Sequence, residues 1–368
     1  MRFLEPDGSF APTPEAEPLR EIVEGLDDAM LEQLYRDMAV IRAFDQQATM
    51  LQRQGQLALW PPSWGQEAAQ VGSARAARTQ DTIFPSYREH VVAKIRGVDP
   101  VQILALMRGT THGGWDPTDP KNGNTRLYTL VLGTQVPHAT GFAMGLNFDG
   151  RTATGNPEKD EAVVVYYGDG AASEGDVHEA MVFAASYKTP QLFFLQNNQW
   201  AISVPVTTQA AGAPLANRSA GYGIPTMRID GNDVLASYAA SRMYLDEARA
   251  GGGPRAIEAV TYRMGAHTTS DDPTKYRTRE EEQMWAQRDP IARMRAFLEN
   301  RGASEQFFAD VDAEGEALAA DARERVVKLP NPDPSSMFAN VYSEPHALME
   351  QQAAWLAEYE ASFEGDAE

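Results

Sequence analysis

The sequence places an acid inside a glycine turn that follows a strand-like segment. The run AVVVYY at 162–167 is apolar throughout and leads into Gly168-Asp169-Gly170. Many nucleotide-binding folds hold a phosphate where a strand turns into a helix, so a carboxylate is unexpected here. A second polar group, Asn197-Asn198, follows the apolar run QLFFLQ at 191–196, with 26 residues between Gly170 and Asn197. These two groups are the first candidates for shared chemistry.

Asp169 and the asparagine pair can share a divalent cation. A strand, a helix and a second strand within this length are typical of a βαβ unit, whose parallel strands end at one edge of the sheet. The carboxylate and an amide oxygen would meet there, and both suit Mg²⁺, which commonly also binds phosphate. The sequence thus predicts that Asp169 holds a metal ion and that the ion holds a diphosphate. Amides of the helix that begins near Ala171 would add donors for the anion.

Other interpretations of this turn fit the sequence less well. A dinucleotide-binding turn requires a third glycine where this chain has Ser173, and an acid at the end of the second strand, which here ends at Gln196. A phosphate loop of the Walker type requires a Gly-Lys-Ser/Thr, and none follows. A purely structural turn, with SEGD at 173–176 as a helix capping box, would explain the turn alone. The asparagine pair after the second strand argues against that interpretation.

Composition limits the class of protein. The chain has 368 residues, a formal net charge of −20 and no cysteine. This charge argues against sequence-independent nucleic-acid binding, and the absence of cysteine excludes disulfides, thiolate nucleophiles and cysteine metal sites. No apolar run is long enough to span a membrane. The acidic, proline-rich start resembles neither a signal peptide nor a transit peptide, so we expect a cytoplasmic protein.

The elements around the turn alternate as in an α/β protein. We expect an extended arm at 1–27, a main domain at 28–345 and a helical tail at 346–368. A long helix at 28–54, with an apolar stripe and Asp27 as its N-cap, opens the domain.

Further segments extend the alternation. TMRIDG and 255–264 are predicted to be strands with a helix between them, which favours a doubly wound, mostly parallel sheet. The segment 127–135 looks extended. Gly141 and Gly145 share one face of the next predicted helix and would allow close packing there.

Over about residues 28–345 the chain resembles the alpha subunit of the E1 component of 2-oxo acid dehydrogenase complexes. Gly-Asp-Gly followed by Asn-Asn looks like the thiamine diphosphate motif. The pieces GQEAAQVG, YREH, GTQVPHATG, DGNDVLASY and YRMGAHTTSDDPTKYR follow in the family's order. The resemblance implies the thiamine diphosphate-binding fold, with thiamine diphosphate and Mg²⁺ as cofactors. It also implies oxidative decarboxylation of a 2-oxo acid and reductive acylation of E2 lipoyl groups.

The family pattern implies a role for each matching position. Mg²⁺ would be held by Asp169, the side chain of Asn198 and the backbone carbonyl of Trp200. Tyr87 and His267 are the catalytic candidates, and together with Arg88 they match positions near the diphosphate. The other expected cofactor contacts are Leu130, Leu132, Gly168, Gly170, Ala171, Ala201 and Ile202. The expected substrate contacts are Leu59, Tyr87 and Leu130, in an apolar pocket to which Trp60 and Trp64 would contribute.

Two positions need comment beside the family pattern. Gln196 stands where some relatives have an arginine that reaches the diphosphate, so the clamp would depend on Arg88, His267, Mg²⁺ and helix amides. Thr268 stands where mitochondrial relatives have a phosphorylated serine, and we expect it to be an unmodified loop residue. The histidines expected to be structural are His112, His138, His178 and His346.

The resemblance also implies partners. Thiamine catalysis needs a proton relay, and the glutamate that supplies it in this superfamily lies on a second domain for which this chain has no room. We therefore expect an α₂β₂ heterotetramer with an E1 beta subunit, and an E2 acyltransferase as the acyl acceptor. The expected substrate is a branched-chain 2-oxo acid. The alternatives are a pyruvate or acetoin dehydrogenase E1 alpha subunit, and a catalytically silent scaffold that binds Mg²⁺ and diphosphate.

Overall fold

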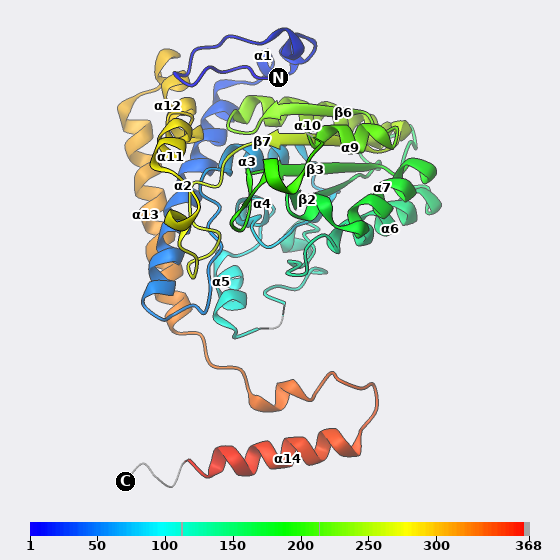
Figure 1. Ribbon diagram of the computed structural model, residues 1–368, viewed down its shortest axis with the longest axis vertical. Helices are drawn as coiled ribbons and strands as arrows, with labels where there is room; N and C mark the ends of the chain where they lie inside the picture. Colours follow the sequence, from blue (N-terminus) through cyan, green and yellow to red (C-terminus); the bar gives the residue numbers. More distant parts are fainter. Residues whose placement is uncertain (112, 213, 364–368) are drawn as a thin grey trace.

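A parallel sheet forms the centre of the structure (Figure 1). The computed structural model describes residues 1–111, 113–212 and 214–363. In spatial order, the five strands of the sheet are β1 Thr82–Phe84, β2 Val163–Gly168, β3 Gln191–Asn197, β7 Arg255–Val260 and β6 Thr226–Asp230. Every neighbouring pair is parallel. A short antiparallel pair, β4 Trp200–Ala201 and β5 Val204–Pro205, follows β3 directly.

The other regular elements are helices, most of which pack around the sheet (Figure 1). They are α1 Arg20–Glu24, α2 Asp28–Arg53, α3 Glu67–Ala76, α4 His90–Ile95, α5 Pro100–Arg108, α6 Gln135–Phe148, α7 Gly175–Tyr187, α8 Val206–Gln209, α9 Ala216–Gly221, α10 Val234–Glu247, α11 Arg279–Ala286, α12 Pro290–Asn300, α13 Glu305–Val327 and α14 Ala347–Ala361. In the part of the chain that the structure describes, no helix combines the length and the apolar content that crossing a bilayer would require.

The two faces of the sheet face separate apolar cores. Val164 and Tyr166 of β2 belong to a cluster with α2, α3 and α10, whereas Val163, Val165 and Tyr167 belong to a second cluster with α6 and α7. Alternate side chains of a strand point to opposite faces, so a continuously apolar strand needs cover on both. The α/β class and the mostly parallel sheet are therefore confirmed, while the doubly wound topology remains a prediction.

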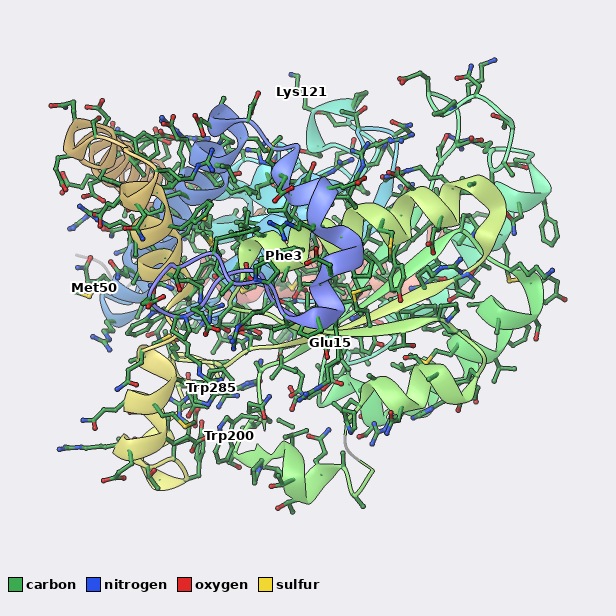
Figure 2. All side chains as sticks on the ribbon, turned by 90° about the horizontal axis from the view of Figure 1, so that it is seen from above. Phe3, Glu15, Met50, Lys121, Trp200 and Trp285 are labelled. Carbon is green, nitrogen blue, oxygen red and sulfur yellow. The ribbon has the colours of Figure 1, made fainter. Side chains whose placement is uncertain are left out.

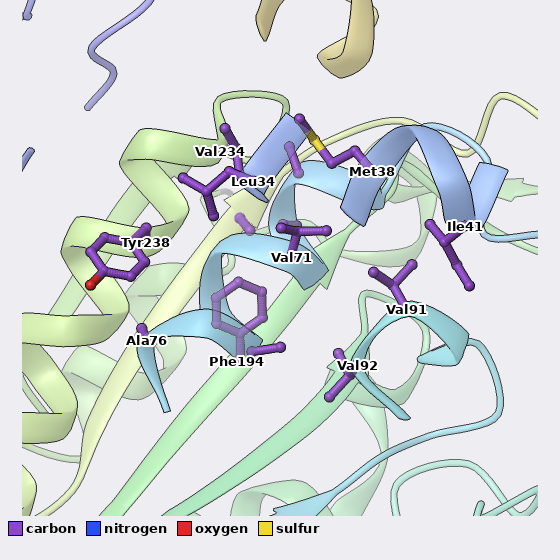
Figure 3. Packing of buried hydrophobic residues seen from close by; sticks show 14 of the residues in the cluster. Leu34, Met38, Ile41, Val71, Ala76, Val91, Val92, Phe194, Val234 and Tyr238 are labelled. Carbon is purple, nitrogen blue, oxygen red and sulfur yellow. The ribbon is translucent and has the colours of Figure 1, made fainter. Parts of the chain in front are cut away.

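Helix α2 joins the larger core to the outer helices. Its stripe Leu34, Met38 and Ile41 faces Val71 of α3 and Val91 of α4 (Figure 3). The Asp27 side chain accepts a hydrogen bond from the Met30 amide at 2.8 Å, as an N-cap does. The predicted helix at 28–54 is thus confirmed to within one residue.

The N-terminal segment is built into the main domain. Phe3 and Leu4 are fully buried, and their amides donate to the Asp233 carboxylate at 2.6 and 2.9 Å. Phe3 lies over the central part of the molecule when this is seen from above (Figure 2). Residues 14–24 form short helices, so the segment is extended only in part.

The last helix has a different environment. After α13 the chain leaves the body of the molecule, and α14 lies apart from it (Figure 1). None of its residues is buried, and Trp355 is 63% exposed. Residues 364–368 of the expected tail lie outside the described residues. The boundaries at 27 and 345 remain predictions.

The segment 127–135, which the sequence predicts to be extended, forms no strand. Residues 127–134 form a loop, and α6 already begins at Gln135. Leu130 and Val131 are 63% and 69% exposed, so these apolar side chains cover no sheet partner. Farther along α6, Gly141 and Gly145 have open space beside them.

Candidate active site

The ends of β2 and β3 bring the turn and the asparagine pair together. Gly168 is paired with Gln196 in the parallel register of these strands, so Asp169 and Asn197 leave the same edge of the sheet side by side. The predicted meeting of the acid and the amides is confirmed. The strands dictate this proximity, because parallel neighbours must end at the same edge.

Asp169 has a carboxylate oxygen with no partner. The residue is 1% exposed, and its Oδ2 makes no hydrogen bond with any described group. Burial raises the pKa of Asp169 to about 6, although the amides of Asp169 and Asn198 and the charges of Arg263 and Arg88 oppose this shift. A buried, unsatisfied oxygen is costly unless an additional group binds it. Asp169 therefore has the properties of a cation ligand.

Asn198 and Trp200 form a short turn beside Asp169. The Trp200 amide donates to Asn198 Oδ1 at 3.2 Å, and Asn198 Nδ2 donates to Gln66 Oε1 at 3.2 Å. The described residues contain no group of three or more His, Asp or Glu side chains suited to a metal. The predicted set has only one carboxylate, with amide and carbonyl oxygens for the rest. This all-oxygen donor set fits Mg²⁺.

The glycine turn lies close against the segment after the asparagine pair. A Cβ atom at Gly170 would lie 3.2 Å from the Ala201 Cβ, closer than ordinary contact. Ile202 has a φ of 54° and is 53% exposed, an unusual backbone conformation for a β-branched residue. Gly170 and Ala201 are thus in close contact beside Asp169, and the cofactor contacts expected of Gly168, Gly170, Ala171, Ala201 and Ile202 remain predictions.

The helix start after the turn differs from the expectation. Ala171–Ser173 forms a single 3₁₀ turn, and α7 begins only at Gly175 with Glu174 as its N-cap. No side-chain cap forms there, and Ser173 Oγ accepts from Gln209 Nε2 at 3.3 Å. The SEGD capping box is therefore wrong. Because the irregular turn precedes the helix, the amides nearest Asp169 belong to the 3₁₀ segment.

Arg88 is a buried cation that forms no ion pair with the described residues. It is 6% exposed, and its Nη1 donates to the Pro62 carbonyl at 2.6 Å. Its Nη2 donates to the His267 carbonyl at 2.9 Å. Among the described residues it forms no ion pair, and its guanidinium lies 5.4 Å from the centre of the Tyr87 ring. An anion would complete this site.

His267 and Tyr87 lie together beside Arg88. Their ring centres are 6.2 Å apart in an edge-to-face arrangement. Burial, reinforced by Arg88 and Arg263, lowers the pKa of His267 to about 3. The imidazole is therefore neutral near pH 7. The sequence-predicted residues Tyr87, Arg88 and His267 thus form one cluster.

Arg263 is a site residue that the sequence reasoning missed. It is fully buried, its Nη2 donates to the Ile202 carbonyl at 2.7 Å and to the Tyr276 hydroxyl at 2.8 Å, and its Nη1 donates to the Trp200 carbonyl at 3.3 Å. Burial and the charge of Arg88 lower the pKa of Arg263 to about 10. It makes no ion pair in the described part of the chain. The only sequence signal was its place in YRMGAHTTSDDPTKYR, between a predicted strand and His267.

The predicted apolar substrate pocket remains a prediction. Leu59, Leu130 and Leu132 are 37%, 63% and 41% exposed, so these side chains are available for contacts. Trp60 is fully buried: its indole donates to Asp45 at 2.8 Å and stacks on His90. The expectation that Trp60 contributes to the pocket is wrong, because a buried carboxylate holds it in the core.

The remaining histidines and Trp64 add no group to this cluster. His90 is buried, and burial lowers its pKa to about 3. His178 Nδ1 lies 3.0 Å from the Tyr222 hydroxyl. His346 lies at the start of α14, and His138 is exposed on α6. His112 lies outside the described residues. Trp64 is 40% exposed.

The sequence is similar to that of known proteins over most of its length. The family model for the dehydrogenase E1 component matches residues 35–335. The chain is 44% identical over 345 residues to the 3-methyl-2-oxobutanoate dehydrogenase subunit alpha of Mycobacterium tuberculosis strain H37Rv, covering 94% of this chain and 89% of that protein. It is 37% identical over 329 residues to the pyruvate dehydrogenase E1 component subunit alpha of Bacillus subtilis, covering 89% and 86%. The Staphylococcus aureus MW2 protein of that name is 38% identical over 283 residues, covering 77% and 74%. The chain therefore belongs to the dehydrogenase E1 component family, as an alpha subunit of the 2-oxo acid dehydrogenase type.

Proposed function

We propose that this subunit binds thiamine diphosphate through Mg²⁺ and, together with a beta subunit, decarboxylates a branched-chain 2-oxo acid. Membership in the family implies the thiamine cofactor. One observation supports both the metal and the anion: Asp169, whose carboxylate has an unsatisfied oxygen, lies in the same region as the buried cations Arg88 and Arg263. Asp169 Oδ2 has no partner, and neither Arg88 nor Arg263 makes an ion pair among the described residues.

The positive charges of Arg88 and Arg263 support an anion bound beside them. The whole chain has a formal net charge of −20, so a diphosphate would be repelled at long range unless cations were concentrated locally. Arg88 and Arg263 supply that concentration and lower the pKa of His267 together. Mg²⁺ on Asp169, the Asn198 side chain and the Trp200 carbonyl would supply the rest. Gln196 does not contribute a charge.

His267 is our candidate for proton handling. When bound, the cofactor supplies a nucleophilic carbon and an electron sink for decarboxylation. The neutral imidazole of His267 could accept or return a proton at the reacting centre, and Tyr87 packs against it. Leu59 and Leu130 would contact the substrate, and Leu132 the aminopyrimidine.

The beta subunit completes the site in this proposal. The loop that carries Leu130, Val131 and Leu132 exposes three consecutive apolar side chains next to the start of α6. An exposed apolar run is typical of a surface that a partner covers. We propose an α₂β₂ heterotetramer whose catalytic glutamate lies on the beta subunit, with E2 lipoyl groups as the acyl acceptor.

The relatives' names support the branched-chain substrate. The 44% identical protein is named for 3-methyl-2-oxobutanoate, and the 37% identical one for pyruvate. Pyruvate is therefore the second candidate. The doubly wound thiamine diphosphate-binding fold also belongs to this proposal, supported by the two apolar cores on opposite faces of the sheet. A cytoplasmic location completes the proposal.

One reconstitution experiment tests these points. The chain is purified alone and co-expressed with its beta subunit, then assayed with Mg²⁺, thiamine diphosphate and a panel of branched-chain 2-oxo acids, pyruvate and acetoin. We expect turnover only with the beta subunit, and the highest kcat/KM on a branched-chain acid. Turnover by the chain alone would refute the need for a partner. Binding without turnover on any acid would favour the silent scaffold.

A further inference from the structure

A buried polar chain links the two halves of the candidate site. Its members are Glu89, Gln196 and Gln70, which are 2%, 2% and 0% exposed. Gln196 Nε2 donates to Glu89 Oε1 at 2.6 Å, and Gln70 Nε2 donates to Gln196 Oε1 at 3.1 Å. None of these residues belongs to the metal or anion cluster described above. Their position between the two clusters gives them a different task.

At one end, Glu89 closes the turn that carries Tyr87 and Arg88. Its Oε2 accepts a hydrogen bond from the Ser86 amide at 2.5 Å, so the side chain folds back over the residues between them. Gln70 Nε2 also donates to the Arg88 carbonyl at 3.1 Å. Both contacts are to the backbone of the turn. They therefore fix the backbone position from which the Arg88 side chain extends.

At the other end, Gln196 belongs to β3. It pairs with Gly168 in the sheet and directly precedes Asn197 and Asn198. A hydrogen bond between Gln196 and Glu89 thus ties the anion side of the site to the strand that leads to the metal side. Because Glu89, Gln196 and Gln70 are all buried, each unsatisfied hydrogen bond among them would be costly.

We propose that Glu89 and Gln196 act as a positioning pair, which holds the turn with Tyr87 and Arg88 in register with Asp169 and Asn198. The inference rests on the proposed binding of thiamine diphosphate and Mg²⁺. It gives Gln196 a role in this chain through its amide geometry.

The direction of the hydrogen bonds makes the pair testable. Both oxygens of Glu89 accept hydrogen bonds, so in Glu89→Gln the new side-chain NH₂ must face another donor, either the Ser86 amide or Gln196 Nε2. If the side-chain amides of Gln196 and Gln70 both rotate by half a turn to compensate, Gln70 presents its oxygen to the Arg88 carbonyl and that hydrogen bond is lost. The exchange Glu89→Gln with Gln196→Glu restores every bond. The amide introduced at position 89 then accepts from Ser86 and donates to the carboxylate introduced at position 196, which also accepts from Gln70.

The experiment measures binding as well as turnover on the reconstituted complex. Calorimetry follows thiamine diphosphate binding in the presence of Mg²⁺, and kcat and KM are measured on the same samples. We expect Glu89→Gln to weaken cofactor binding about tenfold, as one mismatched buried hydrogen bond would, with a smaller change in kcat. The double exchange should recover most of this loss.

A matched control separates positioning from general stability. Asp160 is also buried, and its Oδ1 accepts from the Thr154 amide at 2.7 Å in a loop outside the site. Asp160→Asn should leave cofactor affinity unchanged. If wild type binds no thiamine diphosphate, the proposed function itself fails. If wild type binds and Glu89→Gln binds equally well, or the double exchange rescues nothing, the positioning pair is refuted.

Discussion

Arg88 Nη2 donates to the His267 carbonyl at 2.9 Å and lies 3.3 Å from His267 Nδ1. One buried guanidinium thus holds the turn before α4 against the loop after β7. Arg263 Nη1 approaches the same Nδ1 at 3.3 Å. Two cations converge on a neutral imidazole, and without a bound anion they repel each other. The arrangement is therefore poised to gain free energy when a diphosphate arrives.

Removing the Asp169 charge should abolish metal-dependent binding. In Asp169→Asn the metal loses its only carboxylate, and we expect Mg²⁺-dependent affinity for thiamine diphosphate to fall at least about 100-fold. The metal-free complex should not lose stability, because a buried and unsatisfied charge is removed. Calorimetry and thermal melts measure the two effects. Asp176→Asn, at an exposed acid on α7, is the control. Unchanged affinity in Asp169→Asn would contradict the metal assignment.

Replacing His267 should affect turnover more than binding. In His267→Asn the backbone carbonyl that Arg88 contacts remains, and the asparagine Oδ1 can replace Nδ1 as the atom that Arg88 and Arg263 approach. Loss of a proton-transfer group should lower kcat by about 100-fold. Steady-state kinetics on the reconstituted enzyme, with calorimetry for the cofactor, gives the comparison. His178→Asn serves as the control. A loss of affinity without a loss of kcat would assign His267 to binding instead.

Arg263→Lys should loosen the segment that follows His267. A lysine keeps the charge but cannot reach the Trp200 carbonyl, the Ile202 carbonyl and the Tyr276 hydroxyl together. We expect faster proteolysis between residues 265 and 278 and about tenfold weaker cofactor binding. Arg255→Lys, at the other end of β7, should change neither. Equal proteolysis of wild type and Arg263→Lys would show that the loop is held by other contacts.

Asp45 should make stability depend on pH. Burial raises its pKa to about 7, so the folded state binds more protons than the unfolded state between about pH 4 and 7. The contribution of this group to stability is therefore lost as pH rises through that range. Asp45→Asn keeps the acceptor Oδ1 for Trp60 and Ser63 and removes the charge.

Unfolding in urea at pH 5 and pH 8 measures this effect. Relative to wild type, Asp45→Asn should gain on the order of 1 to 3 kcal/mol in free energy of unfolding between the two conditions. Asp37→Asn on the same helix breaks an ion pair with Arg75 and should destabilise the fold at both values. A difference between Asp45→Asn and wild type that is independent of pH would contradict the buried-charge explanation.

The strands and the turn could be predicted because their signals are local. The runs at 162–167 and 191–196 are apolar on both faces, and β2 and β3 are buried on both. The proximity of Asp169 to the asparagine pair follows from the sheet topology alone. The run at 127–135 is also rich in apolar residues, but pairing with β1 ends at Arg126, and 127–134 form a loop.

The missed and misplaced residues depend on distant contacts. Trp60 looks like a surface aromatic in a loop broken by prolines, and only the Asp45 carboxylate on α2 keeps it inside. Arg263 looks like an ordinary charged residue after a strand. Its burial depends on carbonyls near 200 and a hydroxyl at 276, which no local pattern reveals. Long-range polar contacts of this kind decide the site, while apolar periodicity decides the fold.

The burial of Phe3 and Leu4 depends on a residue that is made much later in synthesis. Their amides bind the carboxylate of Asp233, about two-thirds of the way along the chain. At roughly 5–20 residues per second, residues 3 and 4 wait on the order of tens of seconds for this acceptor to be made. During that interval Phe3 and Leu4 have native contacts with Phe10 of their own segment, but not with the core around Asp233. Until Asp233 is made, Phe3 and Leu4 therefore remain outside the core that they later join.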